Sequence, residues 1–112
     1  MDFIVLVCGG RNFNNKEWLF YQLDSLPNKP TLIIHGAARG ADSLAGVWAK
    51  SRNVPVKTYP ADWDKHGRSA GFIRNKEMIK EKPDLVMAFE GGKGTAHMIK
   101  VARQNDVTVS II

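Results

Sequence analysis

Short apolar runs alternate with helix-forming stretches along the whole chain, and this alternation constrains the fold more than any other feature of the sequence. The runs are residues 3–8, 31–35, 56–59, 85–89 and 107–111. Apolar residues stand at successive positions in 3–8, 31–35 and 85–89, and we interpret all five runs as strands that are buried on both faces. The intervening stretches, at about residues 15–26, 41–49, 68–80 and 95–102, carry apolar side chains at helical spacing. Five strands and four helices in alternation predict a parallel sheet.

The predicted architecture is therefore an α/β, Rossmann-like three-layer sandwich with helices on both faces of the sheet. Right-handed crossovers limit the strand order to a few possibilities. The order 3-2-1-4-5, with a switch point between strands one and four, is the simplest, and the flavodoxin-like order 2-1-3-4-5 is the alternative. A chain of 112 residues without repeats or linkers fits a single domain over residues 1–112.

Composition limits the classes of partner. Sixteen Lys and Arg residues against eleven Asp and Glu give a net charge of +5, which favours anionic partners. The single cysteine, Cys8, allows no internal disulfide and is expected in the core. No apolar stretch approaches membrane-spanning length, so we expect a cytoplasmic protein without a membrane partner. Neither a metal nor a cofactor is expected; Asp62, Asp64 and His66 fit a polar surface loop.

Glycine clusters follow the first, second and fourth predicted strands, at residues 9–10, 36–40 and 91–94. In a parallel sheet all loops that follow strands lie at the same edge, and the order 3-2-1-4-5 makes these three strands neighbours. The clusters would then meet at the switch point, where open α/β sheets bind ligands. Glycine allows the backbone close to a ligand, and helix N-termini attract anions. The pattern predicts a phosphate-bearing ligand.

Other interpretations of these loops stay open. The glycines could serve only tight strand-to-helix turns, which explains one cluster better than three. Two standard phosphate motifs are absent: Gly94 separates Lys93 from Thr95 in what would be a Walker A loop, and no G-x-G-x-x-G follows strand one. Neither an NTPase nor an ordinary dinucleotide dehydrogenase is therefore supported.

Charged and aromatic residues accompany the glycines. Arginine binds phosphate in a bidentate manner, and four arginines fall at or near the predicted strand-to-helix transitions: Arg11, Arg39, Arg68 and Arg74. Asp42 either stabilises the dipole of the second helix or accepts from a ribose hydroxyl or from Arg39. Trp63, in the longer loop after strand three, either stacks on a base or packs beneath that loop.

The combination of these loops resembles a known family. The matching segments are 7–11 with Phe13, 36–42, 60–63, Ala70-Gly71 with Arg74-Asn75 and Met78, and 88–95. Together they resemble the YspA-related branch of the SLOG superfamily, the Rossmann-like group named after Smf/DprA and LOG. The resemblance implies a fold that binds nucleotide derivatives, is often dimeric and is common in bacteria and their phages.

The LOG branch of that superfamily contains phosphoribohydrolases, whose pattern resembles R-K-x-x-M followed by P-G-G-x-G-T-x-x-E. Arg74, Met78, Gly91, Gly92, Gly94 and Thr95 match it here. Asn75 replaces the lysine, Glu90 the proline, and Met98 the glutamate that the resemblance implies as the acid catalyst. Methionine cannot transfer a proton, so enzymatic activity is left open, with Glu90, Asp42 and Arg74 as catalytic candidates.

The expected ligand is a nucleotide-derived small molecule, such as a nucleoside phosphate or an ADP-ribose-like compound. Glycines and Thr95 would cradle phosphate or ribose, Arg39 and Arg74 would carry its charge, and Asp42 would bind its hydroxyls. The predicted binding residues are Gly9, Gly10, Arg11, Gly36, Arg39, Gly40, Asp42, Trp63, Arg74, Asn75, Gly91, Gly92, Gly94 and Thr95. The alternatives are hydrolysis of an N-glycosidic or phosphoribosyl bond, and single-stranded nucleic-acid binding as in the DprA branch.

A homodimer is also expected. The first predicted helix carries more apolar side chains than one face can bury against a sheet: Trp18, Leu19, Phe20, Tyr21, Leu23 and Leu26. A spare apolar face on a small domain favours a second copy of the chain as its partner.

Overall fold

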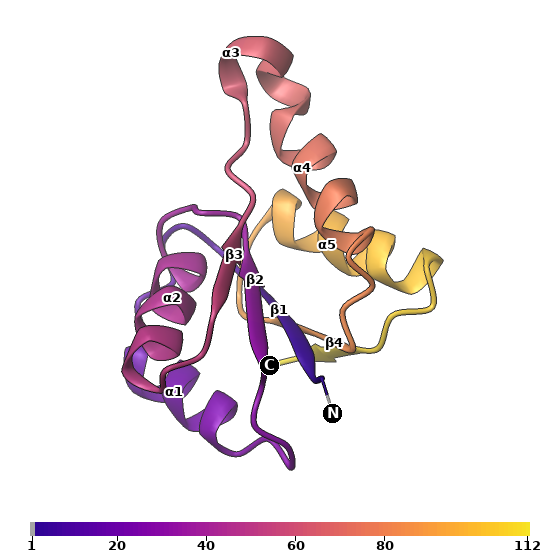
Figure 1. Ribbon diagram of the computed structural model, residues 1–112. Coiled ribbons are helices and arrows are strands. Elements are labelled where there is room, and N and C mark those ends of the chain that lie inside the picture. The colour runs from indigo at the N-terminus through magenta and orange to yellow at the C-terminus, as the bar shows by residue number, and fades with distance from the viewer. Residues whose placement is uncertain (1) are drawn as a thin grey trace.

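The computed structural model describes residues 2–112 and contains one five-stranded sheet (Figure 1). The strands are β1 (Ile4–Cys8), β2 (Leu32–His35), β3 (Val56–Thr58), β4 (Leu85–Ala88) and β5 (Val109–Ile111). All pairs are parallel, and the order is β3-β2-β1-β4-β5. The predicted Rossmann-like order is confirmed and the flavodoxin-like alternative is wrong. The switch point lies between β1 and β4.

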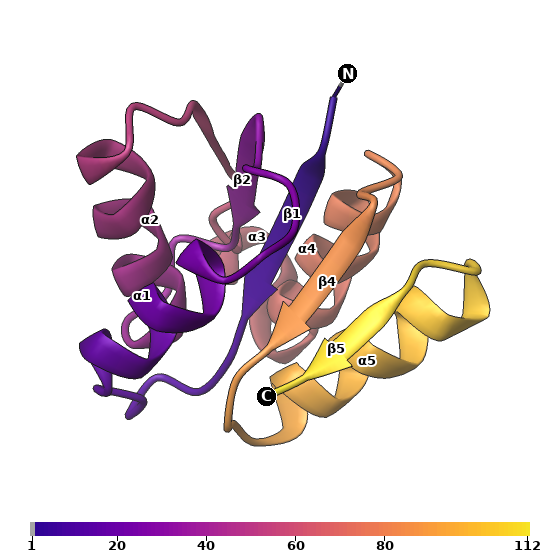
Figure 2. The same ribbon diagram turned by 90° about the horizontal axis from the view of Figure 1, so that it is seen from below.

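Helices cover both faces of this sheet and complete a three-layer sandwich (Figures 1 and 2). α1 (Lys16–Asp24) and α2 (Ala41–Ser51) lie on one face, and α4 (Ala70–Ile79) and α5 (Lys93–Gln104) lie on the other. The bounds of each of these helices lie within two residues of the predicted ones. Across residues 2–112, the helices are too short and too polar for any of them to cross a membrane.

The alternation of side chains along β1 supplies both halves of the core. Val5 and Val7 pack into a buried cluster with α1 and α2, and Leu6 and Cys8 pack into a second cluster with α4 and α5. Residues 5–7 have no exposed surface. β1 is therefore the central strand, and the loop that follows it starts from the buried middle of the sheet.

The predicted burial of residues 56–59 is wrong. All three residues of β3 are exposed, because β3 is an edge strand with a neighbour on one side only. Lys57 forms an ion pair with Glu81, and the Tyr59 hydroxyl donates to the same carboxylate. These contacts attach the edge of the sheet to the end of α4.

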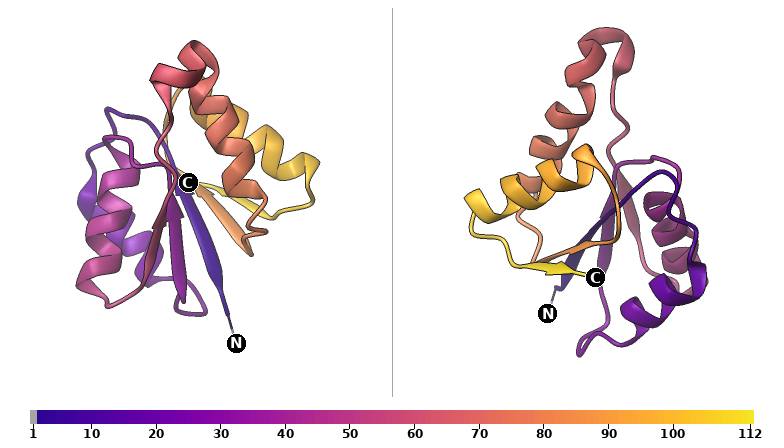
Figure 3. Two further views of the ribbon diagram at one scale, coloured as in Figure 1. Left: turned by 45° about the horizontal axis from the view of Figure 1, so that its top comes forward. Right: turned by 180° about the vertical axis from the view of Figure 1, so that it is seen from behind.

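The long loop after β3 contains a short helix that the sequence analysis did not predict. α3 (Trp63–His66) begins where the Asp62 carboxylate accepts from the Lys65 N–H at 3.0 Å. It ends at Gly67, whose φ of 56° suits glycine. A 3₁₀ turn, Gly67–Ser69, continues directly into α4. α3 and the start of α4 project beyond the carboxyl ends of the strands as an arm (Figures 1 and 3).

Candidate functional site

The three glycine loops converge on the backbone of Gly10. The Gly10 N–H donates to the Glu90 carbonyl at 2.8 Å, and the Gly10 carbonyl accepts from the Ala41 N–H at 3.3 Å. Gly10 thus connects the loop between β4 and α5 on one side with the start of α2 on the other. This is the meeting of loops at the switch point that the strand order predicts.

Several glycines are required by this loop packing itself. A Cβ on Gly40 would collide with the Gly10 carbonyl, and its φ of 79° adds strain for any other residue. A Cβ on Gly91 would lie 2.6 Å from the Gly10 nitrogen, and one on Gly9 would lie 2.5 Å from Ala41 Cβ. At these three positions the packing of the loops is enough to explain why the residue is glycine.

Gly92 and Gly94 are different. A Cβ built on either residue meets no atom within 4 Å, so the packing of the described chain does not require glycine there. Both residues line a cavity of about 380 Å³ beside the loops. The absence of a side chain at these two positions leaves room for a ligand to approach the backbone.

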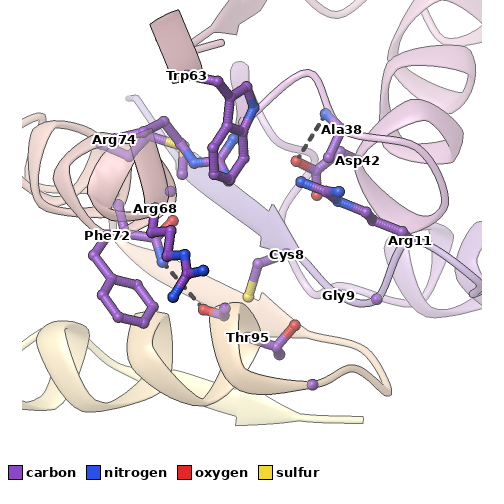
Figure 4. A pocket seen from close by; sticks show the side chains of 16 residues that line it. Cys8, Gly9, Arg11, Ala38, Asp42, Trp63, Arg68, Phe72, Arg74 and Thr95 are labelled. Atoms are coloured by element: carbon purple, nitrogen blue, oxygen red, sulfur yellow. Dashed lines mark hydrogen bonds between the residues drawn. The ribbon is translucent and has the colours of Figure 1, made fainter. Parts of the chain in front are cut away.

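This cavity, which we call the switch-point pocket, lies between the glycine loops and α4 (Figure 4). It is lined by Cys8, Gly9, Gly10, Arg11, Ala38, Asp42, Trp63, Arg68, Gly71, Phe72, Arg74, Asn75, Met78, Gly92, Gly94 and Thr95. Cys8 comes from the end of β1, and Trp63 comes from the arm and overhangs the opening. The pocket therefore combines a glycine-rich backbone wall with an aromatic one.

The lining of the pocket is positively charged. Arg11, Arg68 and Arg74 contribute three guanidinium groups, and among the described lining residues Asp42 is the one carboxylate. The Arg11 guanidinium lies 5.4 Å from the centre of the Trp63 ring, a cation–π distance that links the first glycine loop to the arm. Such a lining suits an anionic ligand.

The N-terminus of α5 adds backbone donors to this charge. The first helical hydrogen bond runs from the Ala96 N–H to the Gly92 carbonyl. In the described chain, the N–H groups of the three residues at 93–95 have no backbone acceptor, and Gly92 has no side chain with which to cap them. Free N–H groups at a helix N-terminus, with the helix dipole behind them, bind anions.

Asp42 and Arg74 hold the second glycine loop from opposite directions. Asp42 Oδ2 accepts from the N–H groups of Gly36 at 2.9 Å and Ala38 at 3.4 Å, whereas Arg74 Nη1 donates to the Gly36 carbonyl at 2.6 Å. A Cβ on Gly36 would lie 2.7 Å from Arg74 Cζ, so glycine is needed for the guanidinium to fit. Burial raises the pKa of Asp42 to about 6, although Ala38, Arg74 and Gly36 oppose the increase.

Asn75 connects α4 to the start of α5. Its side chain is buried, its Nδ2 donates to the Gly94 carbonyl at 3.1 Å, and the same nitrogen lies 3.2 Å from His97 Nδ1. The His97 ring is stacked on Phe72 with 4.2 Å between ring centres. Hydrogen bonds and ring stacking therefore hold together the wall of the pocket opposite the glycine loops.

The structure places most of the predicted site residues around this one pocket. Those that line it are Gly9, Gly10, Arg11, Asp42, Trp63, Arg74, Asn75, Gly92, Gly94 and Thr95. Gly36, Gly40 and Gly91 lie behind this lining, in the loop packing described above. Arg39 is exposed and lines a neighbouring hollow with Ala37 and Pro60.

Three details of the sequence-based site are corrected by the structure. Arg74 was expected near a strand-to-helix transition, but it reaches the pocket from the middle of α4. Asp42 bonds to loop N–H groups and makes no hydrogen bond to Arg39 within residues 2–112. Glu90 is exposed and does not line the switch-point pocket; it lines a neighbouring hollow together with Trp18.

Besides Cys8, five lining residues were not among the predicted binding residues: Ala38, Arg68, Gly71, Phe72 and Met78. The spacing of residues 71, 74, 75 and 78 puts them on one face of a helix, and this signal could have identified Gly71 and Met78. Cys8 is buried as predicted, yet it also lines the pocket. Burial raises the pKa of its thiol to about 12, so it is not a thiolate at neutral pH.

Met98 does not face the pocket. It has no exposed surface and packs in the core cluster between the sheet and the pair α4 and α5. The position of the catalytic glutamate in the LOG pattern is therefore occupied here by a side chain of the core.

A parallel sheet of this order, with its glycine loops at the switch point, defines a Rossmann-like α/β protein. The family described as "YspA, cpYpsA-related SLOG family" matches residues 3–66, and the chain belongs to this family. Membership suggests nucleotide-related binding or processing in general.

The chain is also 35% identical to the Gene 61 protein of Mycobacterium phage D29 over 115 residues, which cover 94% of this chain and 92% of that protein. No solved structure matches the chain significantly.

Proposed function

We propose that this protein binds a nucleotide-derived small molecule, a nucleoside phosphate or an ADP-ribose-like compound, in the switch-point pocket. The observation that carries the proposal is the concentration of anion-binding groups around one cavity. Three arginine side chains line about 380 Å³ of space, and so do residues 94 and 95 at the start of α5, whose N–H groups have no backbone acceptor in the described chain. The family supports the same class of ligand.

The proposed pose follows from the chemistry of the walls. The phosphate lies against the N–H groups of residues 93–95, where Gly92 and Gly94 leave the backbone open. Arg68 and Arg74 supply its countercharge. The base lies toward Trp63, an exposed aromatic ring at the mouth of the pocket. A protein that holds its ligand in this way would sense, sequester or process a nucleotide signal.

Binding without hydrolysis is the version that the side chains favour. Hydrolysis of an N-glycosidic bond in the LOG manner needs a carboxylic acid at the position of Met98, which is buried in the core. Glu90, the residue that could have replaced it, lines another hollow. Neither residue could transfer a proton to a ligand in the switch-point pocket.

A hydrolase remains the second candidate because of Asp42. This carboxyl group lines the pocket, and both of its backbone hydrogen bonds go to Oδ2, so that Oδ1 has no donor among residues 2–112. A pKa of about 6 suits a general acid near neutral pH. Release of free base from nucleoside monophosphates by the wild-type protein, abolished by Asp42→Asn, would establish this alternative.

A thermal-shift screen tests the binding proposal. The panel contains AMP, ADP-ribose, NAD and cyclic nucleotides, with inorganic phosphate as the control for a simple anion effect. A ligand at about 100 times its dissociation constant raises the free energy of unfolding by about 2.7 kcal/mol. If no compound in the panel moves the melting temperature beyond the phosphate control, the proposal fails.

We further propose that the protein acts as a homodimer in the cytoplasm, where nucleotides are available. The support for a second copy is the exposed pair Trp18 and Tyr21 on α1, which stack on each other with 6.0 Å between ring centres. A stacked aromatic pair on a helix surface suits an interface.

A further inference from the structure

The side-chain amide of Asn75 has a fixed orientation. The Gly94 carbonyl, 3.1 Å away, can only accept a hydrogen bond, so the amide nitrogen of Asn75 and not its oxygen must face it. Rotating the amide by half a turn would place two oxygens against each other. The backbone of α5 thus decides which end of the amide faces which neighbour.

His97 uses the second hydrogen of the same nitrogen. His97 Nδ1 lies 3.2 Å from Asn75 Nδ2, and because that nitrogen is a donor, Nδ1 must be the acceptor. The imidazole is therefore neutral, with its proton on Nε2. Its surroundings agree, since desolvation and the charges of Lys76 and Lys100 lower the pKa of His97.

The amide oxygen of Asn75, Oδ1, is the remaining polar atom of this side chain. Asn75 Oδ1 accepts from no donor within residues 2–112, and it is not among the side-chain atoms that are sealed from solvent without a partner. Asn75 itself is only 4% exposed and lines the switch-point pocket. Because Asn75 lines the pocket, an Oδ1 atom without a donor offers a ligand there an acceptor of fixed direction.

We infer that Asn75 selects ligands that carry a hydrogen-bond donor, a hydroxyl or an amino group, next to their anionic group. The inference rests on the proposed function and specifies which nucleotides the pocket prefers. The bond to Gly94 holds Asn75 beside the start of α5, where the phosphate lies. An acceptor oxygen at that point repels a second ionised phosphate oxygen and stabilises a hydroxyl or an amine. A polar site left without its donor discriminates strongly against the analogue that lacks it.

Four nucleotides distinguish the two sources of the donor. AMP is compared with 2′-deoxy-AMP and 3′-deoxy-AMP, which each lack one ribose hydroxyl, and with purine ribonucleoside 5′-monophosphate, which lacks the amino group of the base. Dissociation constants are measured by calorimetry for the wild type and for Asn75→Leu, which keeps the size of the side chain. The matched control is Asn105→Leu: Asn105 also donates its amide to a backbone carbonyl, that of Val101 at 2.8 Å, but at the other end of α5.

We expect the wild type and Asn105→Leu to bind AMP about tenfold more tightly than one of the two deoxy analogues. Asn75→Leu should bind AMP and that analogue equally. A loss confined to a deoxy analogue assigns Oδ1 to ribose; a loss confined to the purine analogue, whose missing amino group is remote from the phosphate, contradicts the position inferred for the donor. Equal binding of all four nucleotides by the wild type, or an unchanged preference in Asn75→Leu, overturns the inference but leaves nucleotide binding standing. If the wild type binds none of the four, this inference fails; the proposed function fails with it only if no compound of the thermal-shift panel binds either.

Discussion

Asp42 and Arg74, on different helices, hold the same peptide segment at Gly36: Asp42 accepts from its N–H at 2.9 Å and Arg74 donates to its carbonyl at 2.6 Å. The two side chains have opposite charge, and each affects the ionisation of the other. The second glycine loop is thereby fixed to both layers of helices. Arg74 consequently has a structural task as well as the proposed task of binding an anion, and experiments on it must separate the two.

Arg74→Ala should weaken the binding of AMP by about tenfold or more, because a charge-assisted hydrogen bond contributes about 1.5–3 kcal/mol. It should also lower the free energy of unfolding, because the Gly36 carbonyl loses its side-chain donor and Asp42 loses a nearby positive charge. Calorimetric titration of the folded variant isolates the first effect, and urea unfolding measures the second. Arg103→Ala, at the exposed last turn of α5, is the matched control. Equal affinity of Arg74→Ala and the control for AMP would remove Arg74 from the binding site.

Gly40→Ala and Gly94→Ala should have different effects on the free energy of unfolding. Gly40→Ala should lower the free energy of unfolding by more than about 1–2 kcal/mol, because its φ is 79° and the Gly10 carbonyl occupies the place of the new Cβ. Gly94→Ala should leave stability unchanged or raise it by up to about 1 kcal/mol, because alanine favours a helix and the space is open. Urea unfolding measures both.

Gly94→Ala should nevertheless weaken AMP binding, because the new methyl group occupies the approach to the α5 N-terminus. Calorimetry with the wild type and Gly94→Ala compares their dissociation constants for AMP. A Gly94→Ala protein with wild-type affinity would contradict the proposed pose.

The raised pKa of Asp42 predicts a pH-dependent effect of Asp42→Asn on stability. Between the ordinary value of 3.8 and about 6, the folded wild type binds a proton that the unfolded chain has lost, so Asp42 stabilises the fold less as the pH rises. Asparagine accepts the same backbone hydrogen bonds and does not titrate. The stability of the variant relative to the wild type should therefore increase by about 1–3 kcal/mol from pH 4 to pH 7.

Urea unfolding of both proteins across this range measures the difference. A difference that stays constant with pH would show that the pKa of Asp42 is not raised.

Met98→Glu should destabilise the fold by several kcal/mol and should not produce a hydrolase, because it buries a carboxylate among apolar side chains. Met98→Leu conserves volume and should cost less than about 1.5 kcal/mol. Melting temperatures and a chromatographic assay for free base from nucleoside monophosphates check both variants and the wild type. A folded Met98→Glu protein that releases base would show that this position reaches the ligand.

Replacing Trp18 and Tyr21 together by alanine should convert a dimer into a monomer, since these side chains are 43% and 62% exposed on α1. Sedimentation velocity at tens of micromolar measures the change. The matched control is Val47→Ala, an exposed apolar residue on α2. A wild-type protein that sediments only as a monomer at these concentrations would refute the dimer.

The sequence by itself determined the architecture. The apolar runs gave the five strands because a central strand covered on both faces must be apolar at successive positions, as residues 5–8 are. The position of the glycine clusters after strands one, two and four, together with the parallel order, brought three loops to one edge. The interpretation failed where burial depends on the position of a strand in the sheet: Val56–Thr58 forms a strand as expected, but it is exposed because β3 lies at the edge.

Only the tertiary structure decided which glycines the loop packing requires and which residues line the pocket. Gly40 and Gly94 both lie at the start of a helix that follows a glycine cluster, yet a Cβ on Gly40 meets the Gly10 carbonyl and a Cβ on Gly94 meets no atom within 4 Å. Arg74 joins Gly36 across 38 positions of sequence, and Asn75 finds Gly94 and His97 from another helix. Secondary structure follows from local periodicity, whereas such contacts depend on how helices cross a sheet, and no local pattern contains that information.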